Sequence, residues 1–135
     1  MGLTNDMCKY YVNGELGSTP TPFDNSHAAI GVGDDSTSFS SGQTKLQAEA
    51  NGSSSLRVGM DSGYPDQDPS SAGNSRKVRY QSTFGSSEAT FSWQEWGVFN
   101  STTSGGGTMK NREVENPGTK GNVQWIFQVD VELIT

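Results

Sequence analysis

The chain has 135 residues, of which 30% are hydrophobic, and carries a formal net charge of −6. This length accommodates one domain and excludes a two-domain enzyme or a large α/β barrel. The low hydrophobic content predicts a thin core, but a charged fraction of 18% is too low for a typical disordered chain. Nine basic residues face 15 acidic ones, which argues against a nucleic-acid partner because phosphate binding requires clustered Lys and Arg.

Membrane insertion and export are not expected from the sequence. No apolar run approaches the ~20 residues that span a bilayer, and the N-terminal residues lack the basic and apolar regions of a signal peptide. Cys8 is the single cysteine and His27 the single histidine. An internal disulfide and a cysteine-based metal cage are therefore excluded.

Residues 1–22 are polar and are interrupted by Gly14, Gly17, Pro20 and Pro22. We expect an irregular N-terminal arm here, separated by these residues from a single β domain over residues 23–135. The arm holds a few apolar side chains that could anchor it to another protein as an attachment element: Leu3, Tyr10, Tyr11 and Val12.

The first part of the β domain is rich in Gly and Ser. Residues 27–33 predict a short strand, and Gln43–Ala50 predict a short helix that is capped by Ser40 or Ser41 and ends at Gly52. Residues 61–76 contain two prolines and no periodicity, which predicts a polar surface loop.

The second half of the chain carries the clearest strand patterns. Residues 78–84 alternate between apolar and polar, and residues 89–100 place apolar groups on both faces, which predicts cover on both sides of that strand. Residues 108–115 predict a strand, residues 116–122 a turn, and residues 122–134 a final strand of 13 residues. The expected fold is mainly β: an antiparallel β-sandwich or β-roll with long Gly/Ser-rich loops and at most one short helix.

The aromatic residues divide into two groups. Four share inward registers and are expected at the centre of the core: Phe91, Trp93, Trp125 and Phe127. Trp96 lies in the opposite register, so it is either covered by a second layer or placed at an interface.

Sites for chemistry are weakly indicated. Gly31–Asp35 (GVGDD) predicts a strand that ends in an Asp-rich turn, because a phosphate-binding loop would need more glycines and a lysine. The basic cluster at residues 76–79 predicts a solvated strand entry. A calcium site at Asp61, Asp66 and Asp68 is open, although their spacing matches no EF-hand. No G-x-S-x-G motif accompanies His27, so we predict no enzyme activity, no catalytic residue, no cofactor and no resident metal.

Four stretches together resemble small structural proteins of tailed bacteriophages: FDNSHAAIGVGDDSTSF (23–39), LRVGMDSGYP (56–65), VRYQSTFGSSEATFSWQEWGVFN (78–100) and GTMKNREVENPGTK (107–120). A weaker likeness extends to the N-terminal module of phage tail-fibre proteins, through Gly33-Asp34 and the segment EWGVF at 95–99. The resemblance implies a virion component without a catalytic site. It also implies a helix-like stretch after residues 3–5. The present sequence differs from that pattern, because its arm is rich in Gly and Pro.

The resemblance leaves three functions open. The sequence ends one residue after its last predicted strand and is acidic, so we expect a capsid decoration (cement) protein on the outer surface of the head, bound to the major capsid protein. The alternative is a tail or tail-fibre adaptor bound to tail proteins, and a third function is a carbohydrate-binding module for host attachment that uses Trp96. A thin core gains stability from assembly, so we expect a homo-oligomer, with a trimer favoured.

Overall fold

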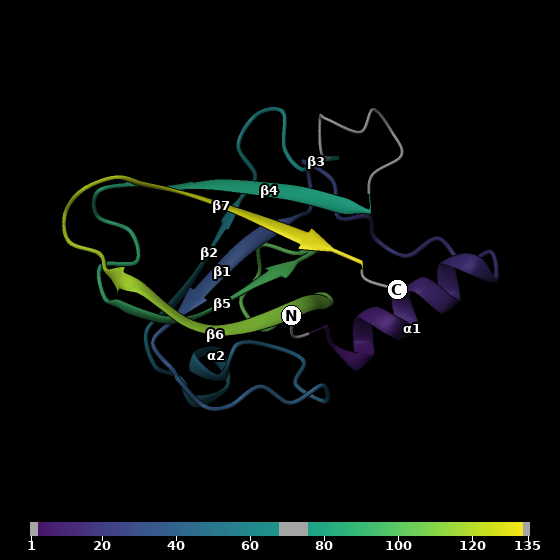
Figure 1. Cartoon of the computed structure of the whole chain (residues 1–135), viewed down its shortest axis with the longest axis horizontal. Coiled ribbons are helices and arrows are strands. Elements are labelled where there is room, and N and C mark those ends of the chain that lie inside the picture. The colour runs from purple at the N-terminus through teal and green to yellow at the C-terminus, as the bar shows by residue number, and fades with distance from the viewer. Residues whose placement is uncertain (1–2, 68–75, 134–135) are drawn as a thin grey trace.

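The computed structural model describes residues 3–67 and 76–133 of the chain. Figure 1 shows two β-sheets packed face to face, with one helix projecting from one end. In chain order the elements are α1 (Asn5–Glu15), β1 (Ala29–Gly33), α2 (Gln47–Asn51), β2 (Ser55–Gly59), β3 (Asp66–Gln67), β4 (Lys77–Phe84), β5 (Ser92–Phe99), β6 (Met109–Thr119) and β7 (Trp125–Glu132).

All strand pairs are antiparallel. One sheet has the order β2-β1-β5-β6 and the other the order β3-β4-β7. The predicted mainly-β antiparallel sandwich is therefore confirmed. A second helix was not predicted: α1 has 11 residues and lies where we expected an irregular arm.

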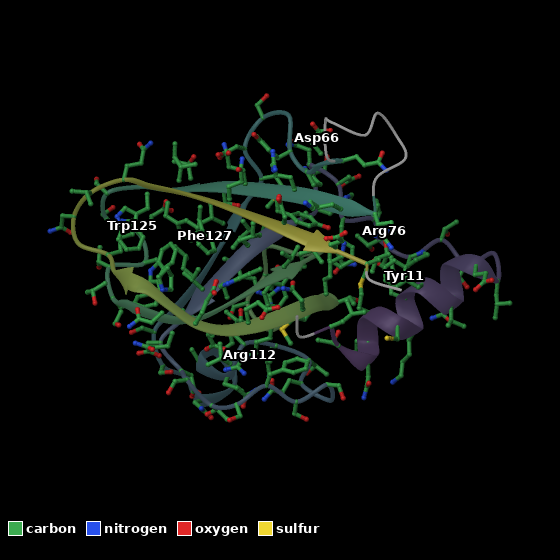
Figure 2. The ribbon with its side chains drawn as sticks, in the orientation of Figure 1. Tyr11, Asp66, Arg76, Arg112, Trp125 and Phe127 are labelled. Atoms are coloured by element: carbon green, nitrogen blue, oxygen red, sulfur yellow. The ribbon has the colours of Figure 1, made fainter. Side chains whose placement is uncertain are left out.

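The core lies between the two sheets. Val32 and Trp96 are cross-strand partners on the inner face of the larger sheet, as are Ile30 and Val98. Trp93 is fully buried and makes edge-to-face contacts with rings of the smaller sheet, with centroid distances of 4.9 Å to Trp125 and 5.4 Å to Phe127; Figure 2 shows these last two side chains between the sheets.

The predicted core centre is thus confirmed for Trp93 and only in part for its companions. Trp125, Phe127 and Phe91 are half-buried and pack against the core cluster from its side. Trp125 begins β7 and lies at the end of the sandwich where β6 passes over into β7 (Figure 2).

The outer face of the larger sheet is covered by residues 34–52, as the apolar residues on both faces of β5 predicted. Leu46 packs there on Phe99 and Met109 in a second small cluster. Gly31 and Gly97 are paired on this face, and a Cβ on Gly97 would lie 2.6 Å from the backbone oxygen of Asn111. These glycines allow the covering segment to approach the sheet closely.

Two ion pairs hold the covering segment on the sheet. Arg112 Nε donates to Glu95 Oε1 at 2.6 Å, and both side chains are fully buried. Glu95 also accepts hydrogen bonds from the first amides of α2, at Gln47 and Ala48. Arg57 pairs with Glu49 of α2, with Nε to Oε2 at 2.7 Å.

Several element bounds differ from the sequence-based predictions. The helix begins at Gln47 rather than Gln43, because Glu95 and Glu49 cap its N-terminus instead of Ser40 or Ser41; its end at Gly52 is confirmed. β6 continues to Thr119 through the predicted turn at 116–122, because a bulge accommodates the extra residues opposite Trp93 and Glu95. β7 has eight residues rather than 13, and Ile134 lies outside the described residues.

Candidate interaction surface

The N-terminal helix is anchored to the edge of β6. Thr4 caps α1 by accepting from Met7 N at 3.1 Å, and its own amide donates to Lys110 O at 3.1 Å. The Thr4 hydroxyl donates to Met109 O, and Leu3 forms a β-bridge with Asn111. The first described residues therefore extend the larger sheet of their own chain, and the expectation of an irregular arm is wrong.

The helix forms because the helix-breaking residues lie at its end. Gly14 lies in the last turn, Leu16 is the C-cap, and Gly17 has φ +94°, which ends the helix. Pro20 and Pro22 follow in the connection to β1. Of the four glycines and prolines that predict an interrupted arm, only Gly14 lies inside α1.

One side of α1 packs on the sandwich and another faces solvent. Met7 is 1% exposed, whereas Tyr11, Val12 and Leu16 are 38%, 52% and 80% exposed. Val12 and Leu16 are one turn apart and therefore share a face of the helix. These three residues form an exposed apolar surface, which we call the α1 face.

A groove of about 350 Å³ lies beside the α1 face, between α1 and the nearby ends of β4, β6 and β7. Its lining residues come from five parts of the chain: Met7, Tyr10 and Tyr11; Phe23; Arg76, Val78 and Tyr80; Lys110; and Leu133. Figure 2 shows Tyr11 and Arg76 at this end of the sandwich. Tyr10 Oη donates to Thr21 O at 3.0 Å, and the Tyr10 ring meets Phe23 edge-to-face at 5.3 Å, so this wall is fixed in place.

The structure separates the five predicted interface residues. Tyr10, Tyr11 and Val12 lie on α1, and Leu3 precedes it on the β6 edge. Trp96 lies in the core, 6% exposed, with its ring 5.9 Å from that of Phe127 and its Nε1 donating to Glu115. Trp96 is covered by the second sheet in the same core cluster as Trp93, so its predicted placement on the opposite face of the strand is wrong. A side chain this buried is not free to stack on a sugar, which the third function requires of Trp96.

The other motifs take local structural roles. β1 ends at Gly33 as predicted, and Asp35 Oδ1 then accepts from Thr37 N at 2.8 Å. Hydrogen bonding to the Thr37 side chain and to the Thr37 amide lowers the pKa of Asp35. His27 Nδ1 lies 2.6 Å from Asp24 Oδ1, and this contact lowers the pKa of Asp24.

The candidate calcium loop is only partly described. Asp61 Oδ2 accepts from Gln81 and Thr83, Asp66 is exposed in β3, and Asp68 lies outside the described residues. Within residues 3–67 and 76–133, no group of three or more His, Cys, Asp or Glu is arranged to hold a metal ion. The same residues contain no helix of the length and apolarity required to cross a bilayer.

The basic cluster at the start of β4 is partly neutralised. Arg79 Nε lies 2.9 Å from Asp130 Oδ1 and Arg76 Nη2 lies 3.7 Å from Glu132 Oε1, both across the β4–β7 pair. This arrangement agrees with the predicted solvated strand entry.

Sequence reasoning did not identify Lys110. Residues 109–112 of β6 are all buried in the structure. Their sequence does not alternate between apolar and polar residues, so no pattern there predicts that Lys110 is buried. A lysine in a polar strand is ordinarily expected in solvent.

A scan against protein-family models, a search of curated proteins and a search of solved structures each give no match to this chain.

Proposed function

We propose that the chain is a non-enzymatic structural protein of a tailed-bacteriophage virion, bound to the outer surface of the head as a capsid decoration protein. The observation that carries the proposal is the set of four stretches that resemble small phage structural proteins. These stretches contain β1, β5 and β6 and all but the first residue of β2 and of β4. They therefore make up nearly all of the four strands of the larger sheet and of the central strand of the smaller one.

The N-terminal region adds a second point of support. The resemblance implies a helix-like stretch after residues 3–5, and α1 begins at Asn5. The helical form of α1 agrees with what the resemblance implies for this region, and this agreement supports the proposal. The net charge of −6 is compatible with an outer surface, away from packaged DNA.

The α1 face is the attachment element in this proposal. Exposed apolar side chains on an otherwise polar helix are typical of surfaces that become buried on association. We expect the chain to assemble on the head as a trimer or around local threefold positions, because phage surface proteins occupy symmetric platforms. Analytical ultracentrifugation of the free protein and symmetry-resolved imaging of the particle would measure this assembly.

The location is tested first, on purified virions of the phage that encodes the chain. Immunogold electron microscopy with an antibody to the chain should label the head. Label confined to the tail would replace decoration by the tail-adaptor alternative, and absence of the chain from virions by mass spectrometry would overturn the proposal.

The attachment element is tested by adding purified protein to particles that lack it. Deleting residues 1–22 is a poor variant, because it removes the buried Thr4 and Met7 along with the α1 face. The double variant Val12→Asp, Leu16→Asp changes exposed residues alone and should reduce occupancy on particles at least tenfold. Val123→Asp is the matched control, since Val123 is 57% exposed outside α1; equal occupancy of the double variant and this control would exclude α1 as the attachment element.

A further inference from the structure

The ammonium group of Lys110 is buried without a counter-ion. Lys110 is 5% exposed, its Nζ donates to the phenol oxygen of Tyr80, and Nζ lies 4.9 Å from the ring centroid of Phe23 and 5.0 Å from that of Tyr80. Among the described residues, no carboxylate lies within ion-pair distance of this nitrogen. A phenol and two aromatic faces compensate an ammonium less fully than an anion does.

The other buried cations of the chain are matched by stronger acceptors. Arg112 and Arg57 each pair with a glutamate, and Lys120 Nζ donates to the backbone oxygens of Gly85 and Gly121. Lysine and arginine are rarely buried unless they are paired. In the part of the chain that the structure describes, Lys120 also lacks a carboxylate but has two carbonyl acceptors, whereas Lys110 has one phenol oxygen and two aromatic faces. Lys110 is also the one of these cations that lies in the lining of the groove beside α1.

The groove has the dimensions and lining of a small-ligand site. Its volume of about 350 Å³ falls within the range of roughly 300–1,000 Å³ that is usual for such sites. Most of its walls are aromatic or aliphatic, and Lys110 supplies a buried positive charge to them. Arg76 lies at the rim, where its side chain is 57% exposed and pairs with Glu132 at 3.7 Å.

We propose that this groove binds a small organic carboxylate with an apolar body, whose carboxylate pairs with Lys110 while the body lies between Tyr10, Tyr11 and Leu133. A neutral apolar ligand would leave the ammonium without an anion, and a small inorganic anion would leave the apolar walls uncovered. The site is a property of the isolated chain and does not depend on the proposed function.

The protonation of Lys110 makes this binding dependent on pH. Burial lowers the pKa of Lys110 to about 8, and a bound carboxylate would raise that pKa because it favours the charged form. The carboxylate should therefore bind more weakly as the pH rises through 8.

The phenols facing Lys110 stay neutral in this range, because burial raises the pKa of Tyr10, Tyr11 and Tyr80 above the ordinary value of 10. Asp24, beyond Tyr10, has a lowered pKa and is ionised. A Cys8→Ser background removes the exposed thiol of α1 from the measurements.

The test uses 3-phenylpropionate as the probe and 3-phenylpropan-1-ol as its uncharged match, both titrated into the full chain and followed by calorimetry and by ¹H–¹⁵N NMR. At pH 7 the acid should bind at least tenfold more tightly than the alcohol, with shifts concentrated at the amides near Lys110, Tyr80 and Tyr11. At pH 9.5 its affinity should fall about tenfold or more as Lys110 loses its proton.

Lys110→Met should weaken binding of the acid at least tenfold, whereas Lys120→Met removes the same charge from a buried lysine outside the groove and should leave binding unchanged. Equal affinities for the acid and the alcohol, NMR shifts outside the groove, or no saturable binding by about 10 mM would each overturn the proposal. The acid–alcohol comparison uses unchanged Lys110, so the result is decisive even if Lys110→Met fails to fold.

Discussion

Glu95 and Arg112 form a fully buried ion pair on the outer face of the larger sheet, between β5 and β6, with Nε and Oε1 at 2.6 Å. The pair is completed by the segment that covers it. Arg112 also donates to the backbone oxygens of Thr37 and Asp35, and Glu95 accepts the first amides of α2. The pair therefore joins the sheet to residues 34–52 as well as β5 to β6.

Removing one partner of this pair should be severely destabilising. Arg112→Met leaves the Glu95 carboxylate buried without its cation, and we expect a loss of about 3–5 kcal/mol in the free energy of unfolding. Urea denaturation followed by circular dichroism measures it. Arg79→Met is the control, because the Arg79–Asp130 pair is about one-third exposed and its loss should cost under about 1 kcal/mol; equal losses in the two variants would contradict the role assigned to Arg112.

Gly97→Ala should destabilise the chain through a backbone clash. The added Cβ would lie 2.6 Å from Asn111 O, an atom of the neighbouring strand that cannot rotate away. The expected cost is about 1–3 kcal/mol, measured as a lower urea midpoint. At Gly42 a Cβ meets nothing within 4 Å, so Gly42→Ala should leave the midpoint nearly unchanged, and a similar shift in both variants would refute the close-packing explanation.

Trp93→Ala should remove the centre of the inter-sheet core. Trp93 is fully buried against Phe84, Trp125 and Phe127, and its truncation should cost about 3–5 kcal/mol. Trp125→Ala should cost less, because Trp125 is half-buried. Thermal denaturation should give a lower melting temperature for Trp93→Ala than for Trp125→Ala. A lower melting temperature for Trp125→Ala would show that the core is centred elsewhere.

Stability should depend on pH through Lys110. Its pKa is about 8 in the folded chain and about 10.5 when unfolded, so between these values the unfolded chain binds more protons. The free energy of unfolding therefore rises with pH in this window, by about 2 kcal/mol between pH 7 and 9.5.

Measurements should end near pH 9.5, because the raised pKa of Tyr80 acts in the opposite direction once the unfolded phenol ionises near pH 10. Urea titrations of the unchanged chain and of Lys110→Met at several pH values isolate the contribution of Lys110 to the pH dependence of the free energy of unfolding, because all other titratable groups are common to both chains. An identical pH dependence in the two chains would show that Lys110 is solvated in the folded protein.

The sequence predicted those parts of the fold whose periodicity reflects simple burial. In β4, Tyr80, Ser82 and Phe84 face the core as their alternation indicated, and cover on both faces of β5 followed from its apolar residues on both registers. These predictions succeeded because the residue types along a strand follow directly from which of its faces are buried.

The remaining features depend on partners distant in sequence. The start of α2 is fixed by Glu95, which lies more than 40 residues away, and α1 is held by the edge of β6. The groove could not be anticipated either, because the burial of Lys110 arises from Phe23 and Tyr80 on separate segments. No local pattern encodes such contacts.

The attachment of Thr4 to β6 also imposes an order on folding. Thr4 and Met109 are 105 positions apart, and closing a loop of this length costs conformational entropy before any contact compensates it. During synthesis, the acceptor of the Asn5 amide, Ser41 O, is made early, but the acceptors of Thr4 on Met109 and Lys110 do not exist until β6 has been made. The helix therefore cannot complete its docking before β6 is in place, so its apolar residues remain exposed to chaperones and to other chains while residues 17–119 are synthesised.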